Sequence, residues 1–161
     1  MLGLFAIGAL WLASSRARIA VLGVLAPLWS WTGGVYHILH FAKINRAVIA
    51  FGALFIAEAI IFLVYAARGR GLELSRDAPA RLWAWLLILY ALLAYPLLGA
   101  LSCHVYPAAP MFGVTPCPLV IFTFGMLLFS RARAPWPLFV VPALWSVIGA
   151  SAAFLLDVYP D

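Results

Sequence analysis

The sequence predicts an all-α protein, a polytopic bundle of about six transmembrane helices that forms one integral membrane domain over residues 1–161. Composition is the first observation behind this prediction. Apolar residues make up 67% of the chain and charged residues only 9%, whereas soluble domains contain roughly 25% charged residues. Fifteen charged side chains cannot cover the surface of a soluble domain. A soluble globule, a disordered chain and a nucleic-acid-binding protein are therefore excluded, despite a pI near 9.7.

The second observation is that the charges divide the chain into long apolar runs, and a transmembrane helix needs about 20 mainly apolar residues. The runs cover residues 1–13, 19–41, 47–67, 82–101, 111–130 and 135–156. The mean hydropathy of +1.11 agrees with this reading. We expect each run to be helical, because backbone polar groups cannot remain unpaired in lipid.

Two of these runs are irregular. The first has 13 residues before Ser14, which is roughly 20 Å of helix and short of a bilayer core of about 30 Å. The spans number five if this first one is incomplete. The fifth run contains Pro116 and Pro118, so we expect its continuous helix to begin near Pro118. In the second run, Gly33 and Gly34 predict a bend.

The third observation is that positive charge gathers on alternate connections. One end of the bundle carries eight arginines, at positions 16, 18, 68, 70, 76, 81, 131 and 133. The opposite end carries only Lys43 and Arg46. The positive-inside rule places the arginine-rich connections in the cytoplasm and both termini outside.

This topology brings every histidine and cysteine to the outer face, as weak candidates for a metal site. The five residues end the second run, end the fourth and open the fifth, and they are His37, His40, Cys103, His104 and Cys117. Imidazole and thiolate ligands suit zinc and copper(I). Because His37 and His40 are three residues apart, they share one face of a helix. The spacing matches no established zinc motif.

Other interpretations of the same residues remain open. Cys103 and Cys117 face an oxidising compartment, where a disulfide would persist and would remove both thiolates as ligands. Unpaired structural cysteines and interfacial histidines are a further alternative. Two histidines from different helices, such as His37 and His104, are also able to ligate one b-type haem. The sequence itself requires no cofactor.

Glu58 is the one acidic residue well inside an apolar run. A charged carboxylate is costly at that depth, so we expect its side chain to face the bundle interior. Two roles stay open for it. Glu58 is either a coupling carboxylate for a proton or cation, or a protonated hydrogen-bond donor between helices.

Several segments in a fixed order resemble a bacterial family of uncharacterised multi-pass membrane proteins, known as a domain of unknown function. The segments are GVYH at 34–37, INRA at 44–47, FGALF at 51–55, YPLLG at 95–99, CP at 117–118, IFTFG at 121–125 and PALWSVIG at 142–149. The resemblance implies a bacterial inner membrane location and carries no catalytic residue with it. Members of that family run longer at both ends, so we expect a short member or a fragment.

Three functions are consistent with these observations. The first is a small inner-membrane protein that binds or moves a metal ion or small solute at its outer face. The second is a non-catalytic scaffold or accessory subunit of a larger membrane complex, and the third is a haem-binding or thiol-redox membrane protein. No phosphate loop, nucleotide fingerprint or nucleophile elbow is present, so a protein without enzymatic activity is favoured, and a membrane redox enzyme stays open as the third hypothesis. The expected partners are the lipid bilayer and either other membrane proteins or a second copy, with no nucleic acid.

Overall fold

The computed structural model describes residues 2–10, 15–69, 73, 80–101, 112–130 and 134–155. Its helices are α1 (Leu2–Ala9), α2 (Ser15–Trp31), η1 (Thr32–His40), η2 (Phe41–Lys43), α3 (Val48–Arg68), α4 (Arg81–Leu89), η3 (Tyr90–Ala94), α5 (Tyr95–Leu101), α6 (Pro116–Leu127) and α7 (Pro137–Leu155). Within the described ranges the structure contains no strand, only an isolated bridge between Phe112 and Thr115. The all-α fold class is therefore confirmed.

Several of these elements join end to end into longer helices. The segments α2, η1 and η2 give one helix over Ala17–Lys43, and α4, η3 and α5 give another over Arg81–Leu101. Together with α3, these make three helices in the described chain that are long and apolar enough to cross a membrane. The apolar helices in α6 and α7 are shorter. A bundle of six spans stays a prediction.

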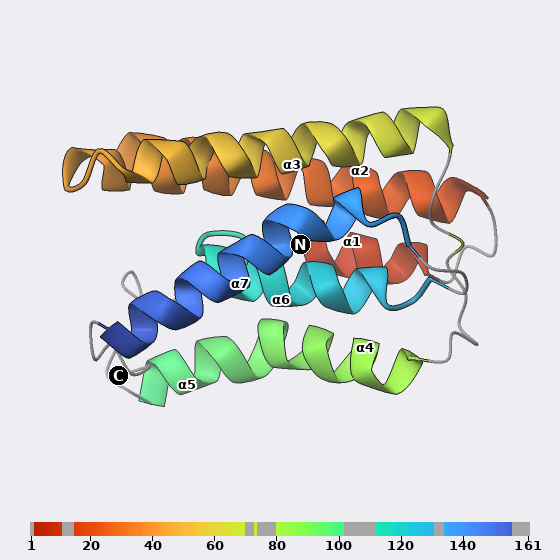
Figure 1. Ribbon diagram of the computed structural model, residues 1–161. Coiled ribbons are helices and arrows are strands. Elements are labelled where there is room, and N and C mark those ends of the chain that lie inside the picture. The colour runs from red at the N-terminus through yellow and green to blue at the C-terminus, as the bar shows by residue number, and fades with distance from the viewer. Residues whose placement is uncertain are drawn as a thin grey trace.

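The helices run back and forth along one common direction, so their ends gather at two ends of the bundle (Figure 1). Arg18, Arg68 and Arg81 lie where α2 begins, α3 ends and α4 begins, and we call this side the arginine end. Lys43 and Arg46 lie at the opposite side, where η2 ends and α3 begins, together with His40. We call that side the histidine end. The described arginine and lysine residues thus lie at the two ends of the bundle.

Gly33 of η1 and Gly52 of α3 allow these two helices to approach each other closely. A Cβ added at Gly33 would lie 2.8 Å from the carbonyl oxygen of Gly52, and a Cβ added at Gly52 would lie 2.8 Å from the carbonyl oxygen of Gly33. Real Cβ atoms do not approach backbone so closely. The two backbones therefore touch, which small residues allow at helix crossings.

The predicted irregularity around Gly33 takes the form of a π-helix, η1, rather than a simple bend. Its i→i+5 pairing is wider than an α-helix and is frequent at functional sites. A second π-helix, η3, ends at Ala94, two residues before Pro96. Because proline has no N–H and its ring crowds the carbonyl four residues earlier, the regular α-helical pairing is interrupted there.

The core joins α2, α3 and α6 through Trp29. This fully buried indole stacks on Phe55 at a centroid distance of 4.5 Å and meets the edge of Phe62 at 5.9 Å. Its Nε1–H donates to Thr123 Oγ1 at 2.9 Å, and the Thr123 hydroxyl donates to the Leu119 carbonyl at 2.9 Å. The polar groups of this contact are thus all paired, as buried polar groups usually are.

The outward surface of α4 and α5 is apolar along its whole length. Leu82 is 65% exposed, Leu93 64% and Leu101 73%. A soluble monomer rarely exposes a continuous apolar strip of this extent. Lipid chains are the natural cover for such a strip, so the surface pattern favours a membrane location.

The helix bounds follow the apolar runs closely, with one correction. The helix α3 covers residues 48–68 where the sequence predicted 47–67. In the fifth run, however, α6 begins at Pro116, two residues before the expected start near Pro118. Both prolines fit because the N–H groups of the first helical turn have no partner within the helix.

We expect Gly33→Ala and Gly52→Ala each to lower the free energy of unfolding by about 1–3 kcal/mol, because a methyl group must push the backbones apart. Gly34→Ala is the matched control, since nothing lies within 4 Å of its added Cβ. We expect that control to be neutral or to raise stability by about 0.5–1 kcal/mol. Reversible unfolding in mixed micelles measures all three. Equal stabilities for Gly33→Ala and Gly34→Ala would contradict the close crossing.

Candidate functional site

The ring of His37 is enclosed by aromatic side chains from η1, α3 and α7. Only 2% of this residue is exposed. Its ring centroid lies 4.9 Å from that of Phe55 and 5.0 Å from that of Trp145, with Tyr36 at 5.1 Å and Phe51 at 6.4 Å. Neither ring nitrogen has a hydrogen-bond partner among the described residues. Burying an imidazole whose nitrogens have no hydrogen-bond partner lowers stability. A bound ligand or a water molecule at this position would supply the partner.

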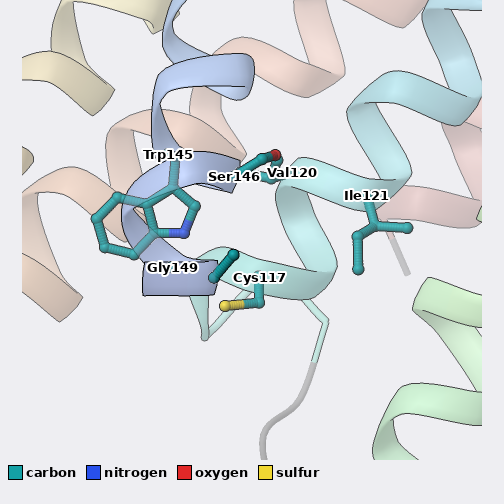
Figure 2. Close-up of a pocket in the computed structure, with 7 residues that line it drawn as sticks. Cys117, Val120, Ile121, Trp145, Ser146 and Gly149 are labelled. Carbon is teal, nitrogen blue, oxygen red and sulfur yellow. The ribbon is translucent and has the colours of Figure 1, made fainter. Parts of the chain in front are cut away.

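A cavity lies next to this aromatic enclosure, between α6 and α7. It has a volume of about 220 Å³ and is lined from α6 by Cys117, Val120 and Ile121 and from α7 by Trp145, Ser146, Gly149 and Ala150. Figure 2 shows the sulfur of Cys117 directed toward the indole of Trp145. The buried Nε1 of that indole has no partner in the described chain. Trp145 therefore borders both His37 and the cavity.

Cys117 also connects to the helix formed by α4 and α5. The half-buried Cys117 interacts with the side chain of Tyr95, the first residue of α5. The thiol thus sits among α5, α6 and α7 at the histidine end of the bundle. Proline on either side of Cys117 sets the start of α6, and this local sequence fixes the thiol in the first helical turn.

His40 has a different environment. It is exposed, and its Nδ1 lies 3.0 Å from the carbonyl oxygen of Val35 in its own helix. Because a carbonyl only accepts, Nδ1 carries the proton in this bond and Nε2 is the nitrogen left to act as a ligand. The shared helix face expected for His37 and His40 therefore does not give them a common environment.

The described part of the chain contains only three of the five residues of the predicted metal site, namely His37, His40 and Cys117. Cys103 and His104 lie outside the described residues. Among the residues that are described, no three His, Cys, Asp or Glu side chains come together in a group able to hold a metal ion. His37, His40 and Cys117 thus make no such site by themselves. The metal, haem and disulfide hypotheses stay predictions that depend on Cys103 and His104.

Glu58 lies in the middle of α3 and is fully buried. It lies on the inward face of α3 that also carries Phe55 and Phe62, and neither carboxyl oxygen has a hydrogen-bond partner within the described ranges. The burial agrees with the expectation that Glu58 faces the interior. An unpaired charge in such a place is strongly unfavourable, so the neutral carboxylic acid is the form that fits this site.

Sequence reasoning missed two polar groups of the same region. Thr32 is fully buried and its hydroxyl oxygen has no partner in the part of the chain described. The indole nitrogen of Trp145 is the other. The signal for Thr32 was its position as a polar residue inside an apolar run, directly before Gly33. Trp145 had no signal of its own, because tryptophan is common at membrane surfaces.

Residues 1–161, the whole chain, match DUF6064, a family of unknown function. The chain belongs to this family. Neither the curated proteins nor the solved structures contain a match. Membership of DUF6064 agrees with the resemblance to a domain of unknown function and assigns no activity. The roles of residues in this DUF6064 chain must therefore be argued from their surroundings.

We expect Glu58→Gln to leave the protein folded and Glu58→Lys to lower its stability by about 2.5–3.5 kcal/mol, the range for a charge at the centre of a transmembrane helix. A neutral amide keeps the size and polarity of the acid. Glu73→Lys, at an exposed position, is the matched control. The folded fraction after extraction from membranes measures the effect. Equal tolerance of lysine at positions 58 and 73 would show that Glu58 is not buried.

Proposed function

We propose that this DUF6064 member is a polytopic protein of the bacterial inner membrane that binds or moves a metal ion or small solute at its outer face. The histidine end of the bundle faces outward and the arginine end faces the cytoplasm. His37 carries the proposal, because its imidazole is enclosed and neither ring nitrogen has a hydrogen-bond partner among the described residues, so both nitrogens are available to a ligand.

Three features support the membrane placement. Three described helices are long and apolar enough to cross a bilayer. The outward side of α4 and α5 is continuously apolar. Arg18, Arg68 and Arg81 gather at one end, where the positive-inside rule requires cytoplasm.

The chemistry of the histidine end supports binding of a small ligand. Trp145, which contacts His37, borders a cavity of about 220 Å³ that is also lined by the thiol of Cys117, and the indole N–H of Trp145 has no partner among the described residues. Imidazole and thiolate are the ligands of zinc and copper(I), and an indole N–H donates to a polar solute. Under this proposal Cys103 and His104, which lie outside the described residues, would complete the metal site, with ligand atoms about 2.0–2.3 Å from the ion.

We expect the purified full chain, reduced and equilibrated with Zn²⁺ in detergent, to retain about one zinc ion per chain after dialysis. His37→Gln should lose most of it, because a main ligand is gone. Glu73→Gln, at an exposed position, should retain zinc as the unchanged protein does. Elemental analysis gives the metal content directly. Absence of zinc from the unchanged protein would contradict a metal site and favour the accessory-subunit function. Equal retention by His37→Gln would contradict the assignment of His37 as a ligand.

We expect a membrane-impermeant maleimide to label Cys103 or Cys117 on intact cells after mild reduction, because the topology places both outside. The control is Glu73→Cys in a chain that lacks the two native cysteines. Its thiol should be labelled only after the inner membrane is permeabilised. Labelling in the reverse order would overturn the orientation.

A further inference from the structure

The cavity between α6 and α7 has a wall that is almost entirely apolar. Its α6 side presents the branched side chains of Val120 and Ile121, and on its α7 side Gly149 and Ala150 contribute almost no side chain. Among the described residues, no Asp, Glu, Lys, Arg or His side chain lines it. An apolar cavity in a protein stays free of water and takes up apolar molecules. The occupant that fits this wall is therefore neutral and mainly apolar.

The wall also contains a hydrogen-bond donor without a partner. The Nε1 of Trp145 is buried and unpaired in the described chain, and Figure 2 shows it on the side of the indole that faces Cys117 and Gly149. A Cβ added at Gly149 would lie 3.8 Å from this nitrogen and within 4 Å of no other neighbour, so space is open beside it. The Ser146 hydroxyl already donates to the Pro142 carbonyl at 2.9 Å. Because the indole nitrogen is shielded from bulk water, its acceptor must come from a molecule in the cavity.

The size of the cavity favours a compact molecule over a lipid tail. The lining spans residues 117–121 of α6 and 145–150 of α7, which is about 6–8 Å of helix. A lipid tail extends through half of a hydrocarbon core of about 30 Å. An apolar cavity of about 150 Å³ binds benzene. The volume of about 220 Å³ here therefore suits a six-membered ring with several substituents.

The cavity opens toward the surroundings of the bundle. On its α7 side Ser146 and Ala150 are exposed, whereas Val120 on its α6 side is buried. In the proposed membrane location these surroundings are lipid. A lipid-soluble molecule therefore reaches the cavity from within the bilayer.

We propose that this cavity binds a neutral, lipid-soluble ring compound with a carbonyl oxygen, the chemistry of a quinone head group, and that this oxygen accepts a hydrogen bond from Trp145. A carbonyl fits better than a hydroxyl group, because it accepts without bringing a donor that would need its own partner. The proposal rests on the solute-binding part of the proposed function and names the class of solute. It needs neither a metal ion nor a ligand role for His37.

Binding of duroquinone to the full chain in detergent micelles tests the proposal. Duroquinone is a benzoquinone with four methyl groups, so the Cys117 thiol finds no unsubstituted ring carbon to add to. Durene, the tetramethylbenzene that lacks both oxygens, is the matched compound. Equilibrium dialysis against empty micelles measures the amount that the protein itself retains. We expect saturation at about one duroquinone per chain.

Three variants locate the site and the hydrogen bond. Trp145→Phe should weaken duroquinone binding about tenfold, the loss of one hydrogen bond of about 1.4 kcal/mol, without weakening durene binding, which shows that the cavity is intact. Gly149→Val places methyl groups beside the indole nitrogen and should weaken both compounds at least tenfold. Gly23→Val is its matched control, at an exposed position of α2 with nothing within 4 Å of the added Cβ. It should bind both compounds as the unchanged protein does.

Several results would overturn the proposal. They are no retention of duroquinone beyond that of empty micelles, equal changes for the two compounds in Trp145→Phe, or full binding in Gly149→Val. Displacement of duroquinone by an ester-linked phospholipid but not by its ether-linked analogue would assign the cavity to a lipid carbonyl instead. Duroquinone binding without zinc retention would leave the ring site standing and refute the metal site. Zinc retention without duroquinone binding would do the reverse.

Discussion

The contact between Gly33 and Gly52 is the constraint on which the rest of the structure depends. Each carbonyl oxygen occupies the space that a side chain of the other residue would need. This lets η1 lie directly on α3, which brings His37 against Phe51 and Phe55 and encloses it with Trp145 of α7. Without the crossing, the polar groups of η1 would face lipid, where an unpaired polar group is costly.

The same bundle contains one interface whose polar groups are paired and one whose polar groups are not. Where α2 meets α6, the indole of Trp29 and the hydroxyl of Thr123 satisfy each other. Where η1 meets α3 and α7, His37, Glu58 and Trp145 have no such partners in the described residues. Packing alone explains the first interface. The second bears a cost in stability, which the proposed binding role would offset.

The apolar runs predicted much of the fold because helix length and charge position are properties of the chain alone. The helix over residues 81–101, predicted from 82, is an example. Burial of Glu58 was predictable because an acidic side chain inside an apolar run avoids lipid by facing the interior of the bundle. The burial of the Thr32 hydroxyl and of the Trp145 indole nitrogen was not predictable, since it depends on which helices become neighbours. The π-helix η1 was not predicted either. The start of α6 was predicted two residues too late, because both prolines fit the first turn of this helix.

A double-mutant cycle on the glycine crossing tests this account most directly. It compares the free energies of unfolding of Gly33→Ala, Gly52→Ala and the double variant with that of the unchanged protein. If the two residues form one contact, the second methyl group enters a gap that the first has already opened. The double variant should then be less destabilised than the sum of the single variants by about 0.5–3 kcal/mol. Additivity within about 0.3–0.5 kcal/mol would show that the residues do not touch and would contradict the interface on which the candidate site depends.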